Sequence, residues 1–334
     1  MKYFNMQTLI KSLDQQSVEL AKKILLEGGV IGMPTETVYG LAGVGTMPNA
    51  VKSIFEIKGR PSDNPLIVHV HKDYDLNKLV VIKHDYVYKL LEKFTPGPLT
   101  LVFESKRVVC DEATCGGDTL AVRIPSHKGC QELLKAVDMP VVAPSANISK
   151  HTSPVTAEHV YNDLNGKIPL ILDGGKCSGG IESTVLDVTG KVPRILRAGL
   201  ITKEMIESVV GSCLIAEHKD GDKVKSPGVK YKHYRPNCQT ALFTETQLDF
   251  VEKEYLSELE RGGKPFIMCS DQVGEKFADK NLLLLGDTPE KVASNLYDKL
   301  LEGEKIATLI IAVAMPDEKG VNMGIMNRLR KSCG

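Results

Sequence analysis

The chain has 334 residues, of which 42% are hydrophobic and 25% are charged. This composition is typical of a globular protein and excludes an intrinsically disordered chain, and the length favours two domains. Lysine plus arginine balance aspartate plus glutamate at 42 each, so no overall field would attract the protein to nucleic acid or to an anionic membrane.

The charge is unevenly distributed along the chain. Residues 1–210 carry 24 basic and 23 acidic side chains, residues 211–238 carry 6 and 3, and residues 239–334 carry 12 and 16. The middle segment is therefore basic. The acidic tail is a poor candidate for clamping RNA.

The cysteines and the N-terminus indicate where the protein works. The eight cysteines include no C-x-x-C pair, and a chain of this size does not need disulfides, so we interpret them as reduced intracellular thiols. A zinc site would want closely paired ligands. The N-terminal segment lacks the apolar core of a signal peptide, and no run approaches the length of a membrane span. We expect a cytoplasmic protein without membrane contact or a tightly bound metal.

Helical and strand patterns alternate over residues 1–210, which predicts an α/β domain with one mostly covered sheet. An apolar helical face over 18–25 ends at Gly28-Gly29, and a second helix fits 51–57. Further helices are expected near 85–94, 127–137, 155–164 and 202–210. Strands are expected at 30–33, 66–70, 99–103, 120–124, 141–143, 170–172, 184–188 and 194–197.

The alternation stops over residues 211–238, which hold KDGDKVKSPGVKYKHYRP. Turn formers and charges without an apolar period are typical of a linker. Ser226-Pro227-Gly228 predicts a tight turn, and Tyr231 and Tyr234 combine apolar rings with polar tips. These features favour a lid that folds over a bound ligand, and a solvated tether is the alternative.

Residues 239–334 return to the alternating pattern. Strands fit 240–243, 266–269, 282–285 and 308–312, with helices near 246–261, 289–301 and 322–331. This order predicts a second, smaller α/β domain of Rossmann-like type.

The common nucleotide signatures are absent from the sequence. Neither G-x-x-x-x-G-K-[ST] nor G-x-G-x-x-G occurs, and there is no G-x-S-x-G elbow. Any ATP site must therefore be built in another way. Thr37 follows a predicted strand directly, where α/β sheets bind ligands, although Thr35 with Glu36 could simply cap a helix or start a turn.

Two basic segments have open interpretations. Lys58 and Arg60 stand at the end of a predicted helix, where they could hold a polyphosphate or only complement the helix dipole. Arg123 lies inside a strand-like run and needs an anionic partner, which could be a structural carboxylate or a ligand. The loops 144–149, 173–175 and 178–180 are rich in small residues, which suit close approach to a ligand and also ordinary turns.

Taken together, these segments resemble the threonylcarbamoyl-AMP synthase family, the YrdC-type domain in its longer two-domain form. The resemblance runs from about residue 15 to the end. It rests on GMPTETVYGL, KGRPSDNPLIVHV, TLAVRIP, APSANIS, GGIESTVLD followed by ILRAG, SPGVKYKHYRP and MGIMNRLRK. It implies a YrdC-like twisted mixed sheet with helices, plus a Rossmann-like C-terminal domain.

The resemblance implies a nucleotidyltransferase that serves tRNA processing. L-threonine and bicarbonate would give N-carboxy-threonine, whose carboxylate attacks the α-phosphate of ATP, so that pyrophosphate leaves and threonylcarbamoyl-AMP remains. Mg²⁺ is expected to accompany ATP. A downstream tRNA threonylcarbamoyl transferase complex would then use the product to make threonylcarbamoyladenosine, and a weak contact with tRNA is compatible with this role.

The matching motifs also imply roles for individual residues. L-threonine would contact Thr37, His69, Arg123, Ala143 and Ser183. ATP would contact Arg60, Asn64, Thr119, Ser145, Ser153, Arg197 and Tyr234, and Lys58 and Arg60 are implied as the catalytic pair. Since the nucleophile is part of the substrate, the protein needs to orient two anions and to offset charge on the leaving pyrophosphate.

Two other functions remain open at the level of the sequence. One is a double-stranded RNA or tRNA-binding module without catalysis, against which the near-zero charge of residues 1–210 argues. The other is carbamoyl-adenylate chemistry on a different acceptor, as in hydrogenase-maturation relatives. Those relatives embed the domain among zinc and acylphosphatase modules, which this chain lacks.

Overall fold

Local capping signals set the helices, and the computed structural model describes residues 7–216 and 234–334. Asp14 starts the first helix in a capping box with Ser17, and Thr156, Thr202 and Thr288 cap later helices with their hydroxyls. The helices before the second gap are α1 (Gln15–Leu26), α2 (Pro48–Lys58), α3 (Tyr86–Phe94), α4 (Asp111–Thr114), α5 (Lys128–Val137), α6 (Ala157–Leu164) and α7 (Lys203–Val210).

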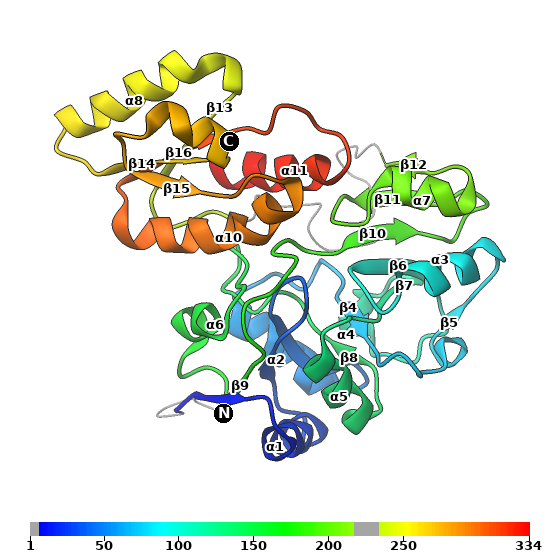
Figure 1. Ribbon diagram of the computed structural model, residues 1–334. Coiled ribbons are helices and arrows are strands. Elements are labelled where there is room, and N and C mark those ends of the chain that lie inside the picture. The colour runs from blue at the N-terminus through cyan, green and yellow to red at the C-terminus, as the bar shows by residue number, and fades with distance from the viewer. Residues whose placement is uncertain (1–6, 217–233) are drawn as a thin grey trace.

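The described part of the first unit contains one large mixed sheet of twelve strands, in the order β1-β9-β2-β3-β8-β4-β7-β6-β10-β11-β12, with β5 paired to β6. Parallel and antiparallel neighbours both occur, and helices cover the sheet (Figure 1). The strands are β1 (Leu9–Ser12), β2 (Ile31–Met33), β3 (Gly40–Val44), β4 (Ile67–His69), β5 (Val80–Val81), β6 (Leu99–Ser105), β7 (Thr119–Arg123), β8 (Val141–Val142), β9 (Leu170–Asp173), β10 (Thr184–Asp187), β11 (Arg194–Arg197) and β12 (Leu214–Ile215).

The predicted α/β fold class is confirmed, and four strands are additions to the predicted set, one of them the two-residue strand β5. No strand was predicted over Gly40–Val44, but this segment forms β3 between β2 and β8. Its glycines hid the strand pattern, because glycine is depleted in strands. Leu9–Ser12 pairs with β9 as an exposed edge strand, and Leu214–Ile215, inside the predicted linker, pairs with β11.

The second unit is a parallel sheet in the order β13-β16-β14-β15, counted over the residues after the gap at 217–233. All of its strand pairs are parallel, and helices lie on both sides in Figure 1, as predicted for a Rossmann-like unit. Its elements are β13 (Gln239–Phe243), α8 (Leu248–Glu260), β14 (Pro265–Cys269), α9 (Asp271–Gly274), β15 (Leu282–Leu284), α10 (Pro289–Ile306), β16 (Leu309–Val313) and α11 (Val321–Cys333).

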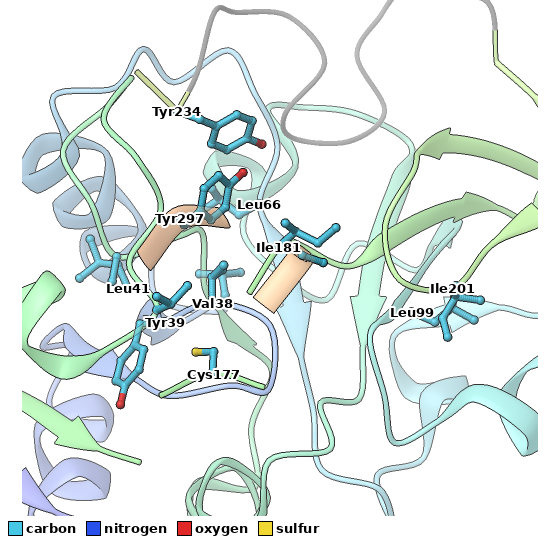
Figure 2. Close-up of a cluster of buried hydrophobic side chains, with 14 of the residues drawn as sticks. Val38, Tyr39, Leu41, Leu66, Leu99, Cys177, Ile181, Ile201, Tyr234 and Tyr297 are labelled. Atoms are coloured by element: carbon cyan, nitrogen blue, oxygen red, sulfur yellow. The ribbon is translucent and has the colours of Figure 1, made fainter. Parts of the chain in front are cut away.

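The two units share one hydrophobic core. A single cluster of buried side chains includes Val38 and Ile181 of the first unit together with Tyr297 of α10 and Ile325 of α11. Figure 2 shows Ile181 between the loop that carries Val38 and the tyrosine rings of Tyr234 and Tyr297. The second unit is therefore packed onto the first by apolar contacts, with α10 and α11 on the facing side (Figure 1).

Among the helices that the structure describes, none is both long and apolar enough to cross a membrane.

Candidate functional site

Neighbouring strands of the large sheet carry the predicted site residues to one place. In the order β8-β4-β7-β6-β10-β11, His69 pairs with Arg123 across β4 and β7, and Arg123 pairs with Thr100 across β7 and β6. Ser183 directly precedes β10, which pairs with β6, and Val185 pairs with Arg197 at the end of β11. Residues far apart in the sequence thus form one row along the sheet.

This row borders a pocket with about 680 Å³ of empty space, part of which is open to solvent. The pocket is lined by eleven of the thirteen predicted site residues, namely Thr37, Lys58, Arg60, His69, Arg123, Ala143, Ser145, Ser153, Ser183, Arg197 and Tyr234. Lys150 and His151 also line the pocket, and Glu182 is the lining carboxylate among the described residues. A surplus of cations suits an anionic ligand.

Thr37 is held by a turn that Thr35 organises. The Thr35 hydroxyl accepts from the backbone N–H groups of Thr37 and Val38, at 3.2 and 3.3 Å, and donates to the Val38 carbonyl at 2.7 Å. The chain then enters β3, so Thr35 starts a turn and does not cap a helix. This turn delivers Thr37 to the pocket.

Arg123 has a protein carboxylate beside it. Its Nη2 lies 2.8 Å from Oε1 of Glu36, and its Nη1 donates to the Thr37 hydroxyl at 2.8 Å. Burial alone would raise the pKa of Glu36, but the Arg123 guanidinium lowers it below its ordinary value. The structural salt bridge is therefore present, and the same guanidinium also lines the pocket.

His69 is a neutral imidazole in the pocket wall. Burial, reinforced by the positive charge of Arg123, lowers its pKa to about 3. Its Nδ1 lies 3.1 Å from the Ile67 carbonyl, which can only accept, so Nδ1 carries the proton. Nε2 consequently keeps a lone pair and can accept a hydrogen bond from a ligand hydroxyl or ammonium group.

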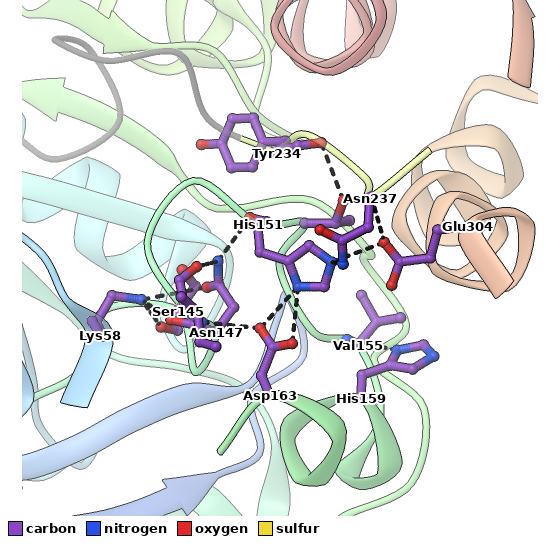
Figure 3. A network of polar contacts seen from close by, with 12 residues as sticks. Lys58, Ser145, Asn147, His151, Val155, His159, Asp163, Tyr234, Asn237 and Glu304 are labelled. Carbon is purple, nitrogen blue, oxygen red and sulfur yellow. Dashed lines mark hydrogen bonds and ion pairs between the residues drawn. The ribbon is translucent and has the colours of Figure 1, made fainter. Parts of the chain in front are cut away.

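Lys58 anchors the loop that follows β8. Its Nζ donates to the carbonyls of Ser145 at 2.5 Å and Asn147 at 2.7 Å (Figure 3). Burial and then the nearby charge of Arg60 lower the pKa of Lys58 to about 7. Arg60 follows the left-handed Gly59, and its Nη2 donates to the Asn64 carbonyl at 2.9 Å. Of the two cations, Lys58 thus holds the loop.

Ser183 and Arg197 form a second polar wall. The Ser183 hydroxyl lies 2.8 Å from that of Thr100, and Arg197 donates from Nε and Nη2 to the Ser183 carbonyl at 3.1 and 3.0 Å. Both Ser183 and Arg197 are buried. The arginine fork therefore fixes the backbone beside the Ser183 hydroxyl.

Tyr234 and His151 connect the pocket to the second unit. Tyr234 is buried and stacks on Tyr297 with ring centroids 5.3 Å apart, and its carbonyl accepts from Thr152. His151 Nδ1 and Nε2 lie 2.9 Å from Asp163 and Glu304 respectively (Figure 3). The pocket wall therefore continues into contacts with α10.

Two predicted ATP residues, Asn64 and Thr119, do not line the pocket. Asn64 is fully buried, and within the described residues both polar atoms of its side chain lack a hydrogen-bond partner. Thr119 begins β7, four residues before Arg123. Since Ile67 pairs with Ala121, Thr119 and Asn64 lie at the same end of the β4–β7 pair, away from the row above.

The sequence analysis missed several lining residues. Glu182 is the most consequential, and the others include Val38, Ile67, Asn147 and His151. Glu182 and Asn147 stand inside the segments GGIESTVLD and APSANIS, so those motifs were the available signal. His151 lies two residues after the second motif and had no signal of its own. In the described ranges, no group of three or more His, Cys, Asp or Glu side chains could hold a metal ion.

Two family models match the chain. The Sua5/YciO/YrdC model, described as telomere recombination, matches residues 23–199, and the model for the C-terminal domain of threonylcarbamoyl-AMP synthase matches residues 201–334. Curated relatives have the same organisation. The threonylcarbamoyl-AMP synthase of Pyrococcus abyssi is 39% identical over 96% of this chain and 95% of its own length, and that of Bacillus subtilis is 38% identical over 97% and 94%.

Solved structures agree with these matches. The crystal structure of P. abyssi Sua5 complexed with L-threonine superposes with a TM-score of 0.88 at 37% identity, covering 98% of this chain and 97% of that chain. Escherichia coli YciO has a TM-score of 0.52 at 24% identity over 59% of this chain and 97% of its own. The latter likeness concerns the fold of the first unit.

Proposed function

This chain belongs to the threonylcarbamoyl-AMP synthase family, and we propose that the pocket described above is where L-threonine, bicarbonate and ATP combine. One observation carries the proposal. A single pocket is lined by all five residues expected to contact L-threonine and by five of the seven expected to contact ATP. We propose the residue roles below on that basis.

The threonine end of the pocket has groups for each part of the amino acid. The Arg123 guanidinium would pair with the threonine carboxylate, as arginine forks do. Nε2 of His69 would accept from the threonine hydroxyl or ammonium group, because Nδ1 is occupied at the Ile67 carbonyl. Ala143 offers an apolar wall for the methyl group.

The ATP end would lie toward Arg60, Ser145, Ser153 and Arg197. Arg60 would offset charge on the phosphates. Asn64 and Thr119 do not line the pocket, so their contacts with ATP stay predictions that rest on the motifs alone.

The chemical step needs no protein nucleophile. The amine of L-threonine and the carbon of bicarbonate form a C–N bond with loss of water, and the resulting carboxylate oxygen bonds to the α-phosphorus of ATP. The bond from that phosphorus to the bridging oxygen breaks, and pyrophosphate leaves with the electron pair. The pocket contributes by positioning the two anions and by placing cations near the charge that develops.

Mg²⁺ would travel with the nucleotide. The lining carboxylate, Glu182, already accepts from Ser153, Tyr297 and Arg328, so the donor set suits a metal held mainly by phosphate oxygens and water. Bound in that way, Mg²⁺ would neutralise phosphate charge.

We propose three further features of this function in the cell. The product would pass to a tRNA threonylcarbamoyl transferase complex, in the cytoplasm, with at most a weak contact between tRNA and this chain. Residues 211–238 would act as a lid between domains at 1–210 and 239–334. Residues 217–233 of that lid lie outside the described residues, and the buried ring of Tyr234 next to the pocket is what supports the idea.

The first prediction is that pyrophosphate release from ATP requires both L-threonine and bicarbonate, because the attacking carboxylate forms only from the two together. The measurement is a coupled pyrophosphate assay with each component omitted in turn, with mass analysis of the adenylate product. L-serine is the matched control, since it lacks only the methyl group.

Three results would contradict the proposal. Equal release without an amino acid would remove threonine from the reaction, and equal release with another acceptor would favour the alternative carbamoyl-adenylate chemistry. Tight, salt-sensitive binding of tRNA together with no turnover would favour the RNA-binding module.

A further inference from the structure

Glu182 is a buried carboxylate at the edge of the pocket that the proposed reaction does not use. Its Oε1 accepts from the Ser153 hydroxyl at 2.6 Å, and its Oε2 accepts from the Tyr297 hydroxyl at 3.0 Å and from Nε of Arg328 at 3.1 Å. Tyr297 lies on α10 and Arg328 on α11. One carboxylate of the first unit is thus held by two helices of the second.

The backbones around Glu182 fit these helices closely. Gly180 has φ +73°, and a Cβ at that position would come within 2.3 Å of the Ala293 carbonyl on α10. A Cβ at Gly324 on α11 would lie 3.2 Å from Cα of Gly199. Both approaches are close because glycine has no side chain, so the segment around Glu182 is seated between α10 and α11.

Arg328 makes more contacts than charge neutralisation requires. Its Nη2 donates to the Glu182 carbonyl at 3.3 Å, and its Nη1 donates to the carbonyl of Ala198, which follows Arg197. The side chain is fully buried. A buried ion pair contributes little net stability compared with apolar packing, so these contacts are better explained by the geometry that they impose on the pocket wall.

The contact with Glu182 determines whether the Ser153 hydroxyl donates or accepts a hydrogen bond on the side of the pocket. An ionised carboxylate can only accept, so the Ser153 proton points at Glu182. The lone pairs of the Ser153 oxygen are then left for the pocket. In this state Ser153 can accept from a ribose hydroxyl or an exocyclic amine, and it cannot donate to a phosphate oxygen.

We propose that Tyr297 and Arg328 of the second unit are positioning residues for nucleotide binding, because through Glu182 they make the Ser153 hydroxyl a hydrogen-bond acceptor for the nucleoside part of ATP. The inference rests on the proposed function, since it takes ATP as the ligand of Ser153. It gives the second unit a part in substrate binding through two side chains that do not line the pocket.

The test is a double-mutant cycle with Tyr297→Phe and Ser153→Ala, read out as the dissociation constant of ATP by calorimetry. Tyr297→Phe removes one hydroxyl without changing the ring, so the protein should fold. Loss of one hydrogen bond corresponds to roughly a two- to tenfold change in affinity, and we expect ATP to bind several-fold more weakly while L-threonine binding is unchanged. In the Ser153→Ala background the same change should have a much smaller effect, because the path through Ser153 is then absent, while the ring of residue 297 still stacks on Tyr234.

Tyr255→Phe is the matched control. Tyr255 is also buried in the second unit, and its hydroxyl accepts from the backbone N–H of Asn281 at 3.0 Å, away from Glu182. It should lower thermal stability without changing ATP affinity. Equal effects of Tyr297→Phe in both backgrounds, or an equal loss of ATP affinity in Tyr255→Phe, would overturn the inference.

Calorimetry separates this inference from the proposed function. A wild-type protein that binds ATP but shows no threonine-dependent pyrophosphate release would contradict the function, and the mutant cycle would still decide whether Tyr297 acts on ATP binding through Ser153. A wild-type protein that does not bind ATP would contradict both.

Discussion

At the scale of single residues, two arginines of the pocket differ in how much replacing them would destabilise the protein. Arg123 is buried against Glu36, whose carboxylate lies 2.8 Å away. Arg60 is partly exposed and donates to a backbone carbonyl. Removing Arg123 would strand a buried negative charge, which typically costs about 3–5 kcal/mol. Arg60 is partly exposed, so water can screen whatever charge its removal would uncover.

This difference predicts separate effects of two alanine substitutions. Arg123→Ala should weaken L-threonine binding roughly ten- to hundredfold, more than it weakens ATP binding, and should also lower the free energy of unfolding. Arg60→Ala should weaken ATP binding by a similar factor with a smaller loss of stability. Calorimetry with each ligand and urea unfolding would measure both quantities.

Arg194→Ala is the control for these two variants. Arg194 is exposed on β11 and does not line the pocket, so its loss should leave both affinities unchanged. Normal binding of both ligands by Arg60→Ala and Arg123→Ala would remove the two arginines from the site.

The residue types of the site could be predicted from the sequence, but the contacts could not. The motifs indicated Thr37, Arg123 and Ser183, which the structure brings together along the sheet. They did not indicate that Glu36 would pair with Arg123, or that Glu182 would accept from Arg328, because each pair joins residues whose proximity depends on the order of the strands or on the packing of α11. Asn64 and Thr119 were expected with the others, yet they lie off the pocket.

At the scale of elements, glycines set how closely the second unit approaches the first. Gly180 and Gly175 both have positive φ, +73° and +79°. Around Gly175 a Cβ would meet nothing within 4 Å, whereas at Gly180 it would come within 2.3 Å of the α10 backbone. The two positions therefore separate backbone strain from steric exclusion. Glycines also limited what the sequence could predict: those within β3 kept this strand from being recognised.

Gly180→Ala should destabilise the protein more than Gly175→Ala. The strain of alanine at positive φ costs roughly 1–2 kcal/mol at either site, and overpacking against backbone adds about 1–3 kcal/mol at Gly180 alone. Urea unfolding of the two variants measures the difference. Equal losses of unfolding free energy would show that α10 moves aside freely and that the close approach is unimportant.

At the scale of the whole molecule, His151 joins three parts of the chain. It lies after the β8 loop, between Asp163 of α6 and Glu304 of α10, and Asn237 approaches its Nε2 at 3.3 Å (Figure 3). Burial alone would lower the pKa of His151, but the hydrogen bonds and charges of Asp163 and Glu304 raise it to about 9. The imidazolium is thus a charged link between the two units.

The raised pKa predicts a pH-dependent contribution to stability. Because the folded-state pKa of about 9 exceeds the ordinary value of 6.5, the contribution is complete below pH 6.5 and is lost as the pH rises through 9, with an upper limit of about 3 kcal/mol. The difference in unfolding free energy between wild type and His151→Gln should therefore shrink over this range. Urea titrations at several pH values would show it.

His159→Gln provides the control. Burial lowers the pKa of His159, which lies near Asp298 on α10, so above about pH 7.5 this histidine is neutral in both the folded and the unfolded chain. Its difference from wild type should be flat from about pH 7.5 to 9. A flat profile for His151→Gln as well would mean that His151 is neutral in the folded protein.

The contact between Glu182 and Arg328 has a consequence for protein synthesis. The two residues are 146 positions apart, so at about 5–20 residues per second a ribosome adds the arginine about 7–30 s after the glutamate. During that interval the first unit has emerged with a carboxylate that cannot be buried without its partner. The nucleotide pocket of a nascent chain should therefore stay incomplete until α11 has been translated, and premature termination just before Arg328 should yield a product that has every described strand of the large sheet but binds ATP poorly.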